Sequence, residues 1–169
     1  MVYIMKTITV NGTDYKLEYS FEAAEHKDTV QKMFNVVSGA YMLRKAGMIE
    51  DGDGSGDSVA NAMLDGTGEM VADIPHIVKT CFYSGLLENH GVSEEEAYDI
   101  MKTYMKENKI SFKKLFDDIK ECMEDDGFFD LSGLTDMLKE MQENFEEEEN
   151  PKKEAKTPQD HKKKSTSTK

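Results

Sequence analysis

The chain has 169 residues, of which 33% are charged, and its formal net charge is −13. This length predicts one domain that buries a core without disulfides or metal ions as staples. The negative charge argues against nucleic acid as a direct ligand, because phosphate recognition needs clustered Lys and Arg side chains.

The N-terminal region is predicted to form a β-hairpin. Residues 6–10 and 15–19 alternate apolar with polar side chains, which is typical of half-buried strands. Asn11-Gly12 lies between them, and both residues tolerate the positive φ of a tight turn. The inward face would carry Ile8, Val10, Tyr15, Leu17 and Tyr19. Since an isolated hairpin is marginally stable, we expect this face to pack on helices.

Periodic apolar residues predict helices over most of the remaining chain. They begin at Phe21 and span about residues 28–46, 69–89, 93–106, 111–127 and 131–145. Ser20 is expected to cap the first helix, and Ser93 with Glu96 forms the capping-box pattern of the fourth. Gly47 and Gly127 are expected to end the second and fifth. The predicted fold is therefore α+β and mostly helical, with the N-terminal β-hairpin packed on a bundle of about five helices.

The segment over about 69–89 is the best candidate for the central core helix. Its apolar side chains cover more than one stripe, which indicates contacts on several sides. They are Val71, Ile74, Ile77, Val78, Cys81, Phe82 and Leu86. Pro75 predicts either a helix that starts just before it or a bend there. In the last helix, one inward stripe is expected from Leu134, Met137, Leu138 and Met141.

The composition changes near the end of the chain. Four glutamates stand at 146–149, and residues 151–169 hold seven lysines against two acidic residues, a net charge of +5. The first 150 residues therefore carry −18. An aperiodic charged segment has no apolar surface to offset the entropy of ordering. We expect a domain over residues 1–146 and a disordered charged tail over 147–169.

The cysteines and the apolar runs indicate the compartment. Cys81 and Cys122 show no spacing typical of a disulfide framework or a zinc site, so we expect buried free thiols in a reducing environment. The first residues lack the basic and apolar regions of a signal peptide. No apolar run approaches the roughly 20 residues of a membrane helix. We therefore expect a cytoplasmic protein without membrane contact.

An acidic loop over residues 51–57 matches the opening of a calcium-binding EF-hand. Asp51, Asp53 and Ser55 would be the first three ligands, and Gly56 would make the sharp turn. The twelfth position, which needs a bidentate Glu, is Ala62. We therefore expect no specific calcium binding and no metal site.

Other patterns that carry chemistry are missing from the sequence. The histidines, at positions 26, 76, 90 and 161, share no ligand spacing. Asp65-Gly66-Thr67-Gly68 is followed by Glu69 where a phosphate-binding loop needs Lys. Neither cysteine has an adjacent His or a CxxC partner. We expect no enzymatic activity and no cofactor, and a helical body that binds other proteins.

The order of these elements, together with several short phrases, resembles a known family. The phrases are TITVNGTDYKLEYSFEAA, IPHIVKTCFYSGLLENHG, VSEEEAYDIMKTYMKEN and FKKLFDDIKECMEDDGFF. They resemble the tail assembly chaperones of long-tailed phages and prophages that infect Gram-positive bacteria. The resemblance covers roughly residues 5–130 and includes no catalytic signature.

The resemblance implies a function in viral morphogenesis. Such chaperones bind the long helical tape measure protein in the host cytoplasm, keep it soluble during tail tube assembly, and are absent from the mature virion. Many are also made in a longer form by ribosomal frameshifting, which implies the tail tube protein as a further partner. Self-association of this chain remains open.

Five residues are candidates for the partner-binding surface: Tyr83, Leu86, Leu87, Phe128 and Phe129. The core helix has more apolar faces than one small core needs. The two adjacent phenylalanines follow a helix end, so they are not expected to point the same way. The alternative is that all five are ordinary core residues, since buried aromatic side chains usually serve packing.

Two other functions compete with the chaperone interpretation. One is an acidic regulatory protein that inhibits a host protein by mimicking the charge of nucleic acid. The other is a weak divalent-cation-binding module centred on residues 51–57. The 12 methionines fit an adaptable binding surface, although their usual role as core filler explains them better.

Overall fold

The computed structural model describes residues 6–45 and 59–149. Its elements are β1 (Lys6–Val10), β2 (Thr13–Leu17), α1 (Phe21–Glu25), α2 (Lys27–Val37), α3 (Ala40–Lys45), α4 (Val59–Leu87), α5 (Glu94–Asn108), α6 (Phe112–Asp125), α7 (Phe128–Leu131) and α8 (Leu134–Glu149). The predicted α+β, mostly helical class is confirmed, with eight helices in the described residues rather than about five. The predicted acidic loop, the Gly47 helix end and most of the predicted tail lie outside the described residues.

The β-hairpin is confirmed. β1 and β2 are antiparallel, and Ile8 lies opposite Tyr15. Asn11 and Gly12 have φ values of 50° and 78°, the left-handed conformation that a tight hairpin turn requires. Four of the five predicted inward residues are at most 4% exposed, namely Ile8, Val10, Leu17 and Tyr19. This face packs on α5 and on the C-terminal half of α4.

Three hydrogen bonds tie the second strand and its exit to the C-terminal end of α4. The Glu18 amide donates to the Gly85 carbonyl oxygen at 2.8 Å. The Lys16 amide donates to His90 Nε2, and Asn89 Nδ2 donates to Glu18 Oε2, each at 2.9 Å. These contacts join segments that are far apart in the sequence, so they fix the position of the hairpin relative to α4.

The central helix α4 begins earlier than predicted, at Val59, and has 29 residues. Pro75 lies inside it, so the expectation of a start at the proline was wrong. The C-terminal half forms the core, where Ile77, Phe82 and others are fully buried. Val71, which was predicted to be inward, is 54% exposed because the N-terminal half packs mainly against α3.

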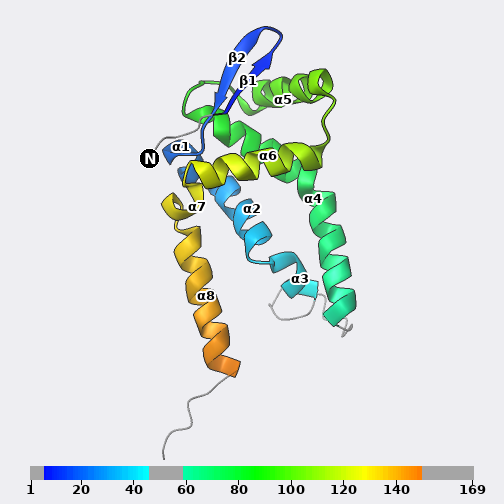
Figure 1. The fold of residues 1–169 in the computed structure, drawn as a ribbon, viewed down its shortest axis with the longest axis vertical. Coiled ribbons are helices and arrows are strands. Elements are labelled where there is room, and N and C mark those ends of the chain that lie inside the picture. Colours follow the sequence, from blue (N-terminus) through cyan, green and yellow to red (C-terminus); the bar gives the residue numbers. More distant parts are fainter. Residues whose placement is uncertain (1–5, 46–58, 150–169) are drawn as a thin grey trace, which may run out of the picture.

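The single helix predicted over 28–46 is two helices, α2 and α3. Gly39 separates them with a φ of 70°, a conformation that ends a helix and that glycine adopts without strain. The break lets α3 turn onto the N-terminal half of α4 (Figure 1). There the Tyr41 hydroxyl donates to Asp73 Oδ2 at 2.6 Å.

Several predicted helix ends are confirmed and one is wrong. The Ser93 hydroxyl accepts from the Glu96 amide, and the Glu96 carboxylate accepts from the Ser93 amide, which completes the capping box. Gly127, with a φ of 74°, follows the end of α6. Ser20 makes no capping hydrogen bond to α1, and its hydroxyl is buried without a partner.

A buried hydrogen bond connects the hairpin exit to the end of α6. The Tyr19 amide donates to Asp126 Oδ2 at 2.8 Å, and Asp126 is 4% exposed. Burial raises the pKa of the Asp126 carboxyl, while the bond from the Tyr19 amide opposes that rise. A carboxylate from one segment thus satisfies a buried backbone donor of another.

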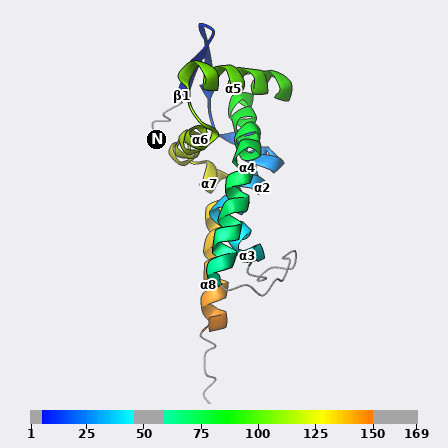
Figure 2. The same ribbon diagram turned by 90° about the vertical axis from the view of Figure 1, so that its right-hand side faces the viewer.

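The molecule is elongated (Figures 1 and 2). The hairpin, α5, α6 and the C-terminal half of α4 gather at one end. The α2–α3 pair, the N-terminal half of α4 and α8 extend toward the other end. α8 packs mainly against α7, and its helical backbone continues to Glu149, past the predicted end near 145. Within the described helices, none has the length and apolar character needed to cross a membrane.

Candidate partner-binding surfaces

The five predicted binding residues do not meet in one groove. Leu86 and Phe128 are 0% exposed and belong to the core. Phe129 is half-buried, and its ring meets that of Phe128 edge-on with centroids 5.4 Å apart. Tyr83 and Leu87 are half-buried on α4. Since Tyr83 and Phe129 line different cavities, a shared role for the five residues in partner binding stays a prediction.

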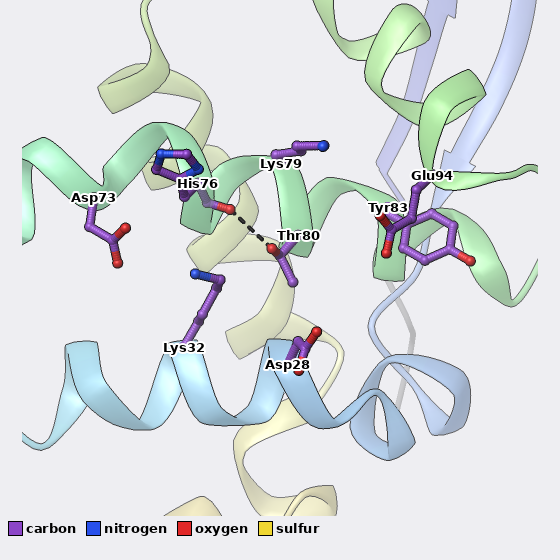
Figure 3. Close-up of a pocket in the computed structure, with 8 residues that line it drawn as sticks. All are labelled: Asp28, Lys32, Asp73, His76, Lys79, Thr80, Tyr83 and Glu94. Atoms are coloured by element: carbon purple, nitrogen blue, oxygen red, sulfur yellow. Dashed lines mark hydrogen bonds between the residues drawn. The ribbon is translucent and has the colours of Figure 1, made fainter.

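The cavity beside Tyr83 is polar and lies between α2, α4 and the start of α5 (Figure 3). It measures about 250 Å³ and is lined by Asp28, Lys32, Asp73, His76, Lys79, Thr80, Tyr83 and Glu94. Both acidic and basic side chains line it, and Lys32 points from α2 toward α4. Within the lining, the Thr80 hydroxyl donates a hydrogen bond to the His76 carbonyl oxygen at 3.0 Å (Figure 3). Such a cavity suits a charged segment better than an apolar one.

A larger and more apolar groove lies between α2 and the start of α8, and we call it the α2–α8 groove. It measures about 490 Å³ and is lined by Ala24, Glu25, Lys27, Val30, Gln31, Phe34, Leu134 and Met137. The apolar side chains of the lining come from α1, α2 and α8, namely Ala24, Val30, Phe34, Leu134 and Met137. Such a lining can take apolar side chains of a partner.

A second groove, which we call the α6–α8 groove, lies between α8 and α6 with the end of α2. It measures about 370 Å³ and is lined by Val37, Lys120, Glu124, Phe129, Thr135, Leu138, Lys139 and Gln142. Phe129 is the predicted binding residue that the structure places here. The two grooves flank the first half of α8, because consecutive turns of that helix contribute to both.

The apolar stripe of α8 is only partly covered, contrary to the prediction that it faces inward. Leu134 is 1% exposed, but Met137 is 47% exposed. Leu138 and Met141 are half-buried. The cause is that α8 leaves the body after α7 and packs little against α2 or α6. An amphipathic helix with an uncovered stripe is a typical docking surface for another helix.

Sequence reasoning missed the contribution of α2 to this surface. Val30 and Phe34 were not among the predicted binding residues, yet they line the α2–α8 groove. The available signal was that α2 carries apolar residues at successive three- and four-residue steps, more than its short length needs for burial. The sequence alone does not show which helix lies opposite them.

The two cysteines are buried, and the described residues hold no metal-ligand cluster. Cys81 and Cys122 are buried free thiols, as predicted. Burial raises the pKa of Cys81 to about 12 and that of Cys122 to about 11, so both thiols are protonated at neutral pH. Within residues 6–45 and 59–149, no group of three or more His, Cys, Asp or Glu side chains is placed to hold a metal ion.

No family model, curated protein or solved structure matches the chain. The resemblance to tail assembly chaperones therefore rests on the order of elements and on the quoted phrases.

Proposed function

We propose that this protein is a phage tail assembly chaperone that binds the tape measure protein in the host cytoplasm and keeps it soluble during tail tube assembly. The family resemblance supplies the partner, and the surface of α8 supplies a physical means of binding it. The chaperone acts as a binding module without catalysis and leaves before the virion is complete.

The uncovered apolar stripe of α8 is the observation that supports this proposal most directly. Met137 is 47% exposed, and grooves of about 490 and 370 Å³ lie on the two sides of the helix. A tape measure protein exposes long apolar stripes before the tube encloses it, and such stripes aggregate when unprotected. A helix laid against α8 would bury its stripe in the grooves.

Methionine in this surface fits a chaperone of a long partner. Met137 and Met141 are unbranched and polarizable, so they adapt to side chains of different shape. A chaperone that covers many turns of one long helix must accept varied sequences, which favours adaptable contacts over shape-specific ones.

Co-expression with a tape measure protein tests the proposal. We expect the tape measure protein to be insoluble alone, and soluble and co-purified when the full chain is present. An unrelated acidic protein of similar size is the control for a nonspecific effect of charge. If the tape measure protein stays insoluble or does not co-purify, the proposed function is wrong.

A calcium titration separates the chaperone from a divalent-cation module. We expect no heat of specific binding, because Ala62 occupies the position of the closing carboxylate and is 2% exposed within α4. Binding in the micromolar range that Asp51→Ala abolishes would favour the cation module instead.

A further inference from the structure

We propose that α8 and its two grooves bind one amphipathic helix whose apolar stripe is flanked by Lys or Arg side chains. This inference rests on the proposed function, in which the tape measure protein would supply that helix. It adds the location of the binding surface and the chemistry of the segment that the surface accepts.

The dimensions of the surface fit a helix. α8 has 16 residues, which corresponds to a length of about 24 Å at 1.5 Å per residue. Leu134, Leu138 and Met141 recur at four- and three-residue steps, and Met137 lies beside them. A partner helix with apolar residues at the same spacing would place successive side chains along both grooves.

The charge of α8 selects a basic partner. The linings of the two grooves and residues 134–144 of α8 together hold five acidic side chains and three lysines, a net charge of −2. The lysines of the α6–α8 groove already have acidic neighbours: Lys120 lies 3.1 Å from Glu124, and Lys139 lies 3.9 Å from Asp136. Basic side chains on an incoming helix would therefore meet a surplus of carboxylates, whereas acidic ones would be repelled.

The same charges disfavour the two occupants that this chain could provide. A second copy would bring another chain with a formal net charge of −13 against the first. Residues 151–169 have the right sign, at +5, but Ala155 is the only residue among them with an apolar side chain other than proline. That segment cannot fill grooves lined by Val30, Phe34 and Met137. An external helix that is both basic and apolar meets both requirements.

Three synthetic peptides of about 18 residues, long enough to span α8, test the chemistry of the partner by fluorescence anisotropy with the full chain. The first has Leu at helical i, i+3, i+4 and i+7 spacing and Lys elsewhere. The second replaces Lys with Glu, and the third scrambles the Leu positions of the first. We expect the first to bind at least about tenfold more tightly than either of the others. Equal binding by the scrambled peptide would overturn the inference, because charge alone would then explain the affinity.

A pair of matched variants tests the location. Met137→Glu introduces a charge into the stripe, and Leu64→Glu introduces the same charge at a residue that is 72% exposed and lines neither groove. Both side chains are largely exposed, so thermal melting should change little in either variant. We expect Met137→Glu to weaken binding of the first peptide at least about tenfold, and Leu64→Glu to leave it unchanged. If Met137→Glu binds the first peptide as tightly as the unmodified chain does, the proposed location of the binding surface is wrong. A loss of affinity could not be an effect of charge alone, since added negative charge by itself favours a basic peptide.

Two further results would assign the surface to another occupant and so overturn the inference. One is a dimer in sedimentation experiments that Met137→Glu dissociates. The other is a marked gain in peptide affinity when Lys162, Lys163 and Lys164 are all changed to Gln in the full chain.

The peptide assay is independent of the proposed function. If the tape measure protein still co-purifies with Met137→Glu, the function stands and this surface is wrong. If the peptide results hold but the tape measure protein never co-purifies, the surface stands and the function is wrong.

Discussion

The close approach of α3 to α4 at Gly66 allows a test that needs no partner. A Cβ atom on Gly66 would lie 2.7 Å from the Met42 Cα, and 2.8 Å from the Met42 amide nitrogen and the Tyr41 carbonyl oxygen. All three are backbone atoms, so no side-chain rotation can relieve the clash. Gly68 lies two residues later in the same helix, and a Cβ there would meet nothing within 4 Å. The chain thus provides its own control.

The difference between Gly66→Ala and Gly68→Ala follows from this geometry. Each substitution gains about 0.5–1 kcal/mol because Ala restricts the unfolded chain more than Gly and favours helix. Only Gly66→Ala must push α3 away, since carbon atoms pack at about 3.5–4.0 Å. Overpacking of this kind costs about 1–3 kcal/mol. Because the helix gain cancels in the comparison, Gly66→Ala should be less stable than Gly68→Ala by about 1–3 kcal/mol.

Urea unfolding followed by far-UV circular dichroism measures the free energy of unfolding of both variants. α3 and the N-terminal half of α4 lie away from the main core, so the loss can also appear as local opening. Hydrogen exchange of the α3 amides detects that opening, and it should be faster in Gly66→Ala alone. Equal unfolding free energies together with equal α3 exchange would show that the two helices do not approach as described.

Three further predictions concern the core, a cap and a buried carboxylate. Phe128→Ala should lower the free energy of unfolding by about 3–5 kcal/mol in urea unfolding, because Phe128 is 0% exposed. Phe129→Ala should lower it less and should weaken co-purification of the tape measure protein. A larger loss of unfolding free energy in Phe129→Ala than in Phe128→Ala would contradict the burial. Ser93→Ala should cost about 1 kcal/mol by removing the capping box, and an unchanged melting curve would deny the cap a role. Burial raises the pKa of Asp126 above the ordinary Asp value of about 3.9. Between these two pKa values the folded state keeps a proton that the unfolded state releases. The stabilisation that this proton gives is lost as pH rises through that range. The Asn side chain of Asp126→Asn does not titrate, so the unfolding free energy of this variant relative to the unmodified chain should increase as pH rises through that range. A difference in unfolding free energy that does not change with pH would refute the raised pKa of Asp126.

Features set by neighbouring residues could be predicted from the sequence. Asn11 and Gly12 determine the hairpin turn because few residues tolerate positive φ in succession. Ser93 and Glu96 form their capping box through hydrogen bonds that span three residues. Each of these features depends on conformational preferences that act within one turn of the chain, so no knowledge of the rest of the fold was needed.

The start of α4 could not be predicted for the opposite reason. The apolar pattern placed the expected start near Glu69, and Gly66 and Gly68 each disfavour helix. The helix nevertheless extends back to Val59, where it packs along α3. Gly66 permits that contact because it has no side chain, so a residue that weakens the helix locally strengthens the packing of two helices. A local pattern does not contain that compensation.

The candidate binding residues were affected by the same limitation. The excess of apolar residues on the core helix pointed to Leu86, and the adjacent phenylalanines after a helix end pointed to Phe128, but both residues are 0% exposed in the core. The stripe on α8 was expected to be covered but is covered only in part, since α8 leaves the body after α7. Periodicity identifies an apolar face, but it does not show whether another element lies against it.

The sequence by itself determined the hairpin turn, the capping box at Ser93 and the two buried free thiols. The tertiary structure alone decided where α4 begins, which apolar stripe stays uncovered, and that Tyr19 and Asp126 share a buried hydrogen bond. The physical reason is the range of the interactions involved. Turns and caps are stabilised by groups a few residues apart, whereas burial depends on segments that meet only when the whole chain has folded.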